Sequence, residues 1–218
     1  MKPRAAVSRK PVRQRRRPHQ QRSERRIQEI LRATARLLER HGPDKLTTNH
    51  IAAELGVSVG TLYHYFPNKQ AILYAMGVRW LEEWQHAFDA IETMAEPGMD
   101  PGSFVDAAVE RLVGVYQNQR GVLHLVQSMF TIAELRRLDV RSDEVAEERL
   151  ARILKRLGVP GAAAELRRRA RICLKLINVL LLEAMRQDAR TARRTLDDLR
   201  SLLVHELTRS APGQARAA

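Results

Sequence analysis

Apolar residues recur every three or four positions along most of the chain, which is the spacing of one buried face of an α-helix. A first helix is expected from Ser23, a suitable N-cap, to Gly42, which permits a left-handed turn before Pro43. Its inward face would be formed by Ile27, Ile30, Leu31, Leu37 and Leu38.

Three more helices follow closely. The second is expected to run from about Thr47 to Gly56, and the third from its cap Ser58 to Phe66. Pro67-Asn68 ends the third helix and starts a fourth. That fourth helix carries one long apolar face, made of Ile72, Leu73, Met76, Trp80, Trp84, Phe88 and Ile91.

The rest of the chain also has helical patterning. After a loop rich in Pro and Gly at 96–102, Ser103 is expected to cap the next helix. Further helices are expected at about 103–118, 121–137, 142–157, 161–187 and 190–208. No segment alternates as a strand does, so the sequence predicts an all-α fold: an N-terminal three-helix head at 23–84 and a larger helical body at 85–210.

Charge is concentrated at the N-terminus. Nine of the 38 Lys and Arg residues lie in 1–22, which has no acidic residue, and the remaining 29 nearly balance the 25 Asp and Glu. Residues 1–22 are therefore expected to form a disordered basic arm, and 211–218 a disordered tail. The excess positive charge favours a polyanionic partner. No apolar run is long enough for a secretory or membrane segment, and the single Cys173 fits a reducing cytoplasm.

Residues 47–66 have the layout of a helix-turn-helix: a short helix, a turn at Gly56, and a second short helix. Small Ala52 lets the two helices cross closely. The second helix is so short that it buries little apolar surface and adds little to stability. Aromatic and hydroxyl side chains remain on its outer face. That face is therefore expected to contact a partner.

This segment closely resembles the TetR family of transcriptional regulators. The resemblance covers about 24–75 and rests on Thr47, Ile51-Ala52, Gly56-Val57-Ser58, Gly60-Thr61-Leu62-Tyr63, Tyr65-Phe66, Asn68-Lys69 and Leu73. It implies that the helix from Ser58 to Phe66 enters the major groove of double-stranded DNA at a palindromic operator.

The resemblance also implies which residues contact DNA: Thr48, Asn49, Val59, Gly60, Thr61, Tyr63, His64 and Lys69. Thr48 would cap its helix and contact phosphate, and Lys69 would contact the DNA backbone near a helix N-terminus. Val59 can read only methyl groups or shape. Asn49 stands where the family often has Arg, and an Asn suits pairing with adenine.

For the body, the resemblance implies a homodimer and a ligand pocket. The apolar-striped helices of 161–208 would form a four-helix bundle with their symmetry mates, with Ile177 and Leu203 in the seam. The pocket is expected near Tyr116, His124, Gln127 and Phe130 and would take a small apolar or amphipathic effector. The leading hypothesis is a repressor released by that effector, with an activator or a ligand-free role left open.

Two other function classes have some support in the sequence. A basic architectural protein that coats DNA without sequence preference is supported by the arm alone. A hydrolase is suggested by Gly56-Val57-Ser58-Val59-Gly60, which fits the nucleophile elbow G-x-S-x-G. That elbow needs a preceding β-strand, and the segment before it here is helical. The sequence therefore predicts no enzyme activity, and it offers no cofactor or metal site because no His or Cys cluster has zinc spacing.

Overall fold

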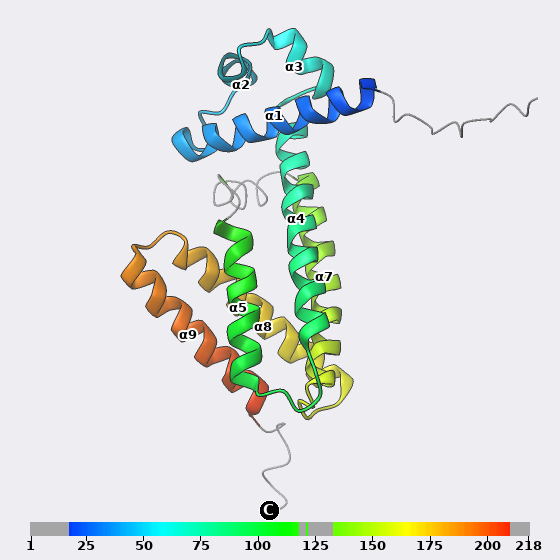
Figure 1. The fold of residues 1–218 in the computed structure, drawn as a ribbon, viewed down its shortest axis with the longest axis vertical. Helices are drawn as coiled ribbons and strands as arrows, with labels where there is room; N and C mark the ends of the chain where they lie inside the picture. The colour runs from blue at the N-terminus through cyan, green and yellow to red at the C-terminus, as the bar shows by residue number, and fades with distance from the viewer. Residues whose placement is uncertain (1–17, 118–120, 122–132, 210–218) are drawn as a thin grey trace, which may run out of the picture.

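The computed structural model describes residues 18–117, 121 and 133–209, and every regular element in these ranges is a helix (Figure 1). With the labels of Figure 1, the helices are α1 Pro18–His41, α2 Thr48–Leu55, α3 Val59–Tyr65, α4 Lys69–Met94, α5 Pro101–Gln117, α7 Ala133–Arg156, α8 Ala163–Ala184 and α9 Ala189–Thr208. The all-α prediction is confirmed. No helix in this part of the chain is both long and apolar enough to cross a bilayer.

The long helix α4 joins a head to a body. Helices α1, α2 and α3 gather at one end of α4, shown at the top of Figure 1, and α1 packs against both α2 and α4. In the body, α4 packs against α5 and α7, α8 lies between α7 and α9, and α9 returns against α5. The recognition element is thus held at one end of the molecule, away from α8 and α9.

Most helix ends follow the residues that sequence reasoning selected. Gly42 and Gly56 adopt left-handed conformations with φ of 72° and 65°, and Ser58 and Asn68 cap α3 and α4. The α5 cap was wrongly assigned to Ser103. Asp100 accepts a hydrogen bond from the Ser103 amide at 2.8 Å, because its carboxylate lies one turn nearer the start of the helix.

Two other helix boundaries were also wrong. The first helix begins at Pro18 rather than Ser23, since proline is well suited to the first helical position, where its missing amide would have no partner. Helix α7 runs unbroken through the break expected between 137 and 142, and it contains neither Gly nor Pro. Residues 122–132, which include most of the helix expected at 121–137, lie outside the described residues.

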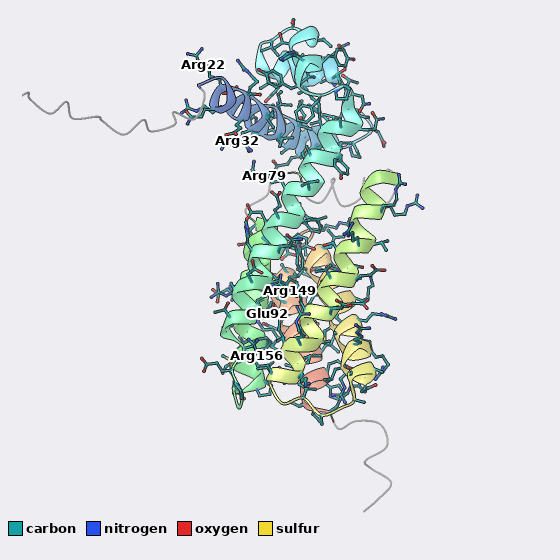
Figure 2. All side chains as sticks on the ribbon, turned by 90° about the vertical axis from the view of Figure 1, so that its right-hand side faces the viewer. Arg22, Arg32, Arg79, Glu92, Arg149 and Arg156 are labelled. Atoms are coloured by element: carbon teal, nitrogen blue, oxygen red, sulfur yellow. The ribbon has the colours of Figure 1, made fainter. Side chains whose placement is uncertain are left out.

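Helix α4 is anchored along its length. Its predicted apolar face is buried in full, from Ile72 to Ile91. Figure 2 shows Arg149 and Arg156 of α7 reaching the side of α4 that carries Glu92. Arg149 Nη2 lies 2.8 Å from Glu92 Oε2, and Arg156 Nη1 donates to the Glu92 carbonyl at 2.9 Å. The body therefore holds α4 by side-chain packing on one face and by arginines on another.

Two separate contacts hold α1, one with α4 and one with Gly121 of the body. The Arg79 guanidinium of α4 donates to the Gln28 side chain of α1. Gly121 lies directly against the α1 backbone: a Cβ added there would be 2.7 Å from the Ala35 carbonyl oxygen, and its φ is 73°. Only glycine satisfies both the conformation and the close approach at this position.

The predicted dimer seam was wrong at the level of single residues. Ile177 and Leu203 are 6% and 5% exposed, so both are buried inside one protomer. A helical stripe cannot by itself distinguish core from interface, and here the regular apolar face points inward. Helix α8 carries a second apolar stripe beside this buried face: Ile172, Leu176 and Leu180 are half-buried, and Val179 is 63% exposed and borders a cavity among α4, α5, α7 and α8.

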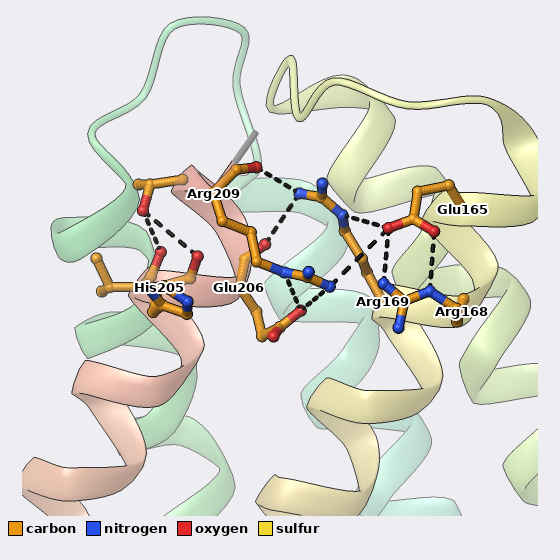
Figure 3. Close-up of polar contacts among 8 residues, drawn as sticks. Glu165, Arg168, Arg169, His205, Glu206 and Arg209 are labelled. Atoms are coloured by element: carbon orange, nitrogen blue, oxygen red, sulfur yellow. Dashed lines mark hydrogen bonds and ion pairs between the residues drawn. The ribbon is translucent and has the colours of Figure 1, made fainter. Parts of the chain in front are cut away.

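A fully buried arginine ties the end of α9 to α8 (Figure 3). Arg169 Nη1 donates to the carbonyl of Glu206 in the last turn of α9 at 3.2 Å and to that of Arg209, the residue that caps α9, at 3.0 Å. Its Nε donates to Glu165 at 3.1 Å. Hydrogen bonds from Arg168, and next from Arg169, lower the pKa of Glu165 to about 2. The Nη2 nitrogen of Arg169 is buried and has no hydrogen-bond partner in the described part of the chain.

Candidate nucleic-acid interface

Buried apolar residues fix the crossing of α2 and α3. Ile51 and Ala52 on α2 and Leu62 on α3 are each at most 2% exposed. The N-cap of α2 is Thr47, whose hydroxyl accepts from the His50 amide at 3.1 Å. The exposed side chains of both helices are therefore presented on a rigid base, although α3 is only 7 residues long.

Ser58 is a helix cap. Its Oγ accepts from the Thr61 amide at 3.1 Å and lies 2.9 Å from the Thr61 hydroxyl. It follows a helix and a turn at Gly56 rather than a strand. The nucleophile-elbow geometry is absent at this serine, and the hydrolase hypothesis loses the feature that suggested it.

The structure brings the residues expected to contact DNA onto one end of the head. Asn49, Gly60, Thr61, Tyr63 and His64 are exposed, and Thr48, Val59 and Lys69 are half-buried. Tyr63 is 50% exposed, and its hydroxyl lies 3.4 Å from the Thr48 hydroxyl, so the two helices meet through a pair of groups that can each bond a phosphate.

Two of these residues have surroundings that sequence reasoning did not anticipate. Thr48 does not cap α2, because Thr47 occupies that position. Lys69 Nζ donates to the Pro43 carbonyl at 3.4 Å, so the ammonium is held against the turn after α1. This contact fixes the lysine at the start of α4, whose first amides also favour an anion.

The single carboxylate of α2 and α3 is neutralised. Glu54 accepts hydrogen bonds from Arg40 at 2.6 Å and Arg36 at 3.1 Å, both on α1. These bonds, first from Arg40 and then from Arg36, lower the pKa of Glu54 below its usual value. The carboxylate stays ionised but paired, so it ties α2 to α1 and adds little repulsion toward a polyanion.

Gly60 is a mid-helix glycine that the fold itself does not require. Its φ is not positive, and a Cβ added there would meet only Ser58 Oγ at an ordinary 3.7 Å. Glycine inside a helix costs about 0.5–1 kcal/mol relative to alanine. The absence of a side chain at this exposed position therefore suits close approach by something outside the chain.

The body contains a cavity of about 260 Å³ bordered by α4, α5, α7 and α8. Tyr116, one of the residues expected at a ligand pocket, borders it; His124, Gln127 and Phe130 lie outside the described residues. Sequence reasoning placed Trp80, Trp84 and Phe88 on the apolar face of α4 but did not connect them with a pocket. Their large rings at every fourth position were the available signal.

The chain matches known families in two segments. Residues 30–76 match the family described as bacterial regulatory proteins, tetR family, and residues 100–207 match the tetracyclin repressor-like C-terminal domain. Among curated proteins, it is 27% identical over 117 residues to the nucleoid occlusion factor SlmA of Marinomonas sp. (strain MWYL1), which is 54% of this chain and 58% of that protein. It is 26% identical over 120 residues to SlmA of Aliivibrio fischeri (strain MJ11), covering 55% of this chain and 60% of the relative.

Solved structures share the fold. A TetR transcription regulator from Haloarcula marismortui superposes with a TM-score of 0.66 at 21% identity, covering 84% of this chain and 97% of that one. The TetR family regulator PfmR from Thermus thermophilus superposes with a TM-score of 0.61 at 21% identity, covering 82% of this chain and 96% of that one. The helix-turn-helix head and the helical body are both matched, and the protein therefore belongs to the TetR family of transcriptional regulators.

Proposed function

We propose that this regulator recognises a palindromic operator through α3 and is a repressor released when a small molecule binds in the C-terminal domain. The observation that carries the proposal is the exposed face of α3. It presents hydroxyl, imidazole and apolar groups around a glycine, on a helix whose position is fixed by Leu62 and by the Ser58 cap.

Dimerisation is part of the proposal. A single recognition helix contacts too few base pairs for useful affinity, and two heads one helical turn apart on DNA correct this. TetR regulators act as dimers, and the second apolar stripe of α8, half-buried except at Val179, offers a surface for a symmetric partner. The residues proposed to face this partner are Ile172, Leu176, Val179 and Leu180, in place of Ile177 and Leu203.

Selection of bound sequences from a random DNA pool tests the proposed specificity. Recovery of one inverted repeat, bound at least about 10³-fold more tightly than random DNA, is the expected result. If random DNA competes as well as the selected sequence, the protein coats DNA without preference, and the architectural alternative replaces this proposal.

We predict that Tyr63→Ala weakens operator binding about tenfold or more and leaves the thermal midpoint unchanged. The ring is half exposed and supports no core packing, and its loss removes a phosphate donor and the contact with Thr48. Binding is measured by fluorescence anisotropy of a labelled operator. Tyr74→Ala, at a similarly exposed tyrosine of α4, is the matched control and retains wild-type affinity.

Gly60→Ala is predicted to have opposite effects on folding and on binding. The free protein should gain up to about 1 kcal/mol of stability, because alanine is the better helix former and the added methyl has room. Operator affinity should fall, because the methyl projects toward the DNA. Urea unfolding and anisotropy on the same preparation measure both quantities. Unchanged affinity in the stabilised variant would place α3 farther from the bases than proposed.

A further inference from the structure

One polar side chain interrupts the apolar face of α8 that borders the body cavity. Leu174, Asn178 and Leu182 all border the cavity and are spaced four residues apart, so they lie on one face of the helix. Asn178 stands at the centre of this face. Asparagine is one of the weaker helix formers, and its carboxamide gains nothing from a place between two leucines. The stability of α8 therefore does not explain an asparagine at this position.

The carboxamide of Asn178 can be reached from the cavity and is not bonded. The residue is half-buried, and its side chain has no hydrogen-bond partner in the described part of the chain. Neither of its polar atoms is enclosed, in contrast to the indole nitrogens of Trp80 and Trp84. A carboxamide supplies one acceptor oxygen and two N–H donors. An occupant of the cavity could therefore bond either atom.

Aromatic rings from α4 and α5 make up much of the remaining wall. The rings of Trp80 and Trp84 are 5.8 Å apart, and each lies 6.0 Å from the ring of Tyr116 in an edge-to-face arrangement. Such rings favour a flat aromatic occupant, which can stack on them or meet their edges. A volume of about 260 Å³ is at the lower end for ligand cavities, and it suits a compound with one or two rings.

The charged side chains that border the cavity, among the residues described, are all paired. Lys175 of α8 and Asp143 of α7 form an ion pair of 2.7 Å. Arg149 Nη2 lies 2.6 Å from Asp89 and 2.8 Å from Glu92. A charged occupant would lose its hydration without meeting a free opposite charge, which is costly. This wall therefore favours an uncharged occupant.

From these observations we infer that the cavity binds an uncharged aromatic compound with one hydroxyl group, and that Asn178 selects it by a hydrogen bond to that hydroxyl. This assignment rests on the proposed function, since it names the class of effector and the residue that recognises it. The rings of the compound lie among the aromatic side chains of α4 and α5. Its hydroxyl lies at the carboxamide on α8.

Three matched naphthalenes test the assignment by equilibrium dialysis against the full chain. 2-Naphthol carries the hydroxyl, 2-methylnaphthalene has nearly the same shape without a hydrogen-bonding group, and 2-naphthoate carries a charge. The carboxylate compound should bind about tenfold or more weakly than 2-naphthol, because its charge has no free partner in the wall. Tighter binding of 2-naphthoate than of 2-naphthol, or no binding of 2-naphthol, would overturn the assignment.

Asn178→Leu isolates the hydrogen bond and completes the leucine face of α8. The quantity measured is the ratio of the dissociation constants of 2-methylnaphthalene and 2-naphthol, in which changes of cavity shape largely cancel. This ratio should fall by about fivefold or more in the variant, which is the loss expected for one hydrogen bond. Circular dichroism melting checks that the variant is folded. Asn178→Ala, which leaves more space in the cavity, should lower the ratio in the same way.

Gln85→Leu is the matched control, since it removes a second carboxamide that borders the cavity. Gln85 is on α4 and exposed, so water satisfies its polar atoms, and the ratio should stay at the wild-type value. An unchanged ratio in both folded Asn178 variants would overturn the role of Asn178. A ratio that falls in Gln85→Leu instead would do the same.

Operator binding by the same preparations separates this inference from the proposed function. Specific DNA binding without binding of 2-naphthol would remove the assigned ligand class and leave the DNA-binding proposal intact. Binding of 2-naphthol that depends on Asn178, without specific DNA binding, would support the ligand class and contradict the proposed function.

Discussion

Val179→Arg should convert the dimer into monomers and reduce operator affinity by about two orders of magnitude. The residue is 63% exposed within the protomer and borders the body cavity rather than the packed core, so the arginine can extend into solvent without displacing core side chains. In a symmetric interface the same position occurs twice, and each arginine would be forced into an apolar surface without a partner. A loss of about 3 kcal/mol in association corresponds to about 100-fold. Multi-angle light scattering measures the mass, and anisotropy measures operator binding.

Val140→Arg is the matched control for this prediction. Val140 lies on α7, is 54% exposed, and receives the same change of side chain. It should remain dimeric with wild-type affinity. If Val179→Arg is also a dimer by light scattering, the protomers do not associate through the second apolar stripe of α8.

The second large effect is expected at Arg169. Replacing it with alanine leaves two carbonyls at the end of α9 without their donor and opens a space where a fully buried side chain stood. Breaking a buried, hydrogen-bonded charge costs about 3–5 kcal/mol. Typical stabilities are about 5–15 kcal/mol, so this is a large share of the total. Urea unfolding at a fixed protomer concentration measures the loss, since dimer stability depends on concentration.

The neighbouring Arg168 separates this anchoring role from simple ion pairing. It bonds the same Glu165, at 2.8 Å, but its side chain is 47% exposed and reaches no carbonyl of α9 in the contacts of Figure 3. Arg168→Ala should lower the free energy of unfolding far less than Arg169→Ala does, because exposed ion pairs contribute little to stability. Equal losses in the two variants would mean that the carbonyl contacts of Arg169 contribute nothing beyond the salt bridge.

Sequence reasoning was most successful where one local interaction decides the structure. Gly42 and Gly56 end helices because glycine readily adopts the left-handed conformation found there. Ser58 begins a helix because its hydroxyl accepts a hydrogen bond from the amide three residues ahead. The predicted cap of α5 was wrong because Asp100 and Ser103 are both suitable N-cap residues. The surrounding Pro- and Gly-rich sequence does not show which of the two begins the helix.

Contacts between segments far apart in the chain could not be predicted from the sequence. Thr48 and Tyr63 meet only because the α2–α3 crossing brings them together, and the Lys69 contact with Pro43 depends on the path of the turn after α1. Ile177 and Leu203 lie on striped helices, but a stripe is equally compatible with a core and with an interface. The positions of neighbouring helices decide between the two.

The two indoles beside the cavity give the protein a built-in optical reporter. Trp80 and Trp84 are the only tryptophans in the chain, so long-wavelength ultraviolet excitation selects emission from this one location. Indole emission shifts to the red as its surroundings become more polar. A spectral change when a compound is added therefore reports events at the cavity without a label. A change when operator DNA is added would show that binding at the head alters the body at a distance.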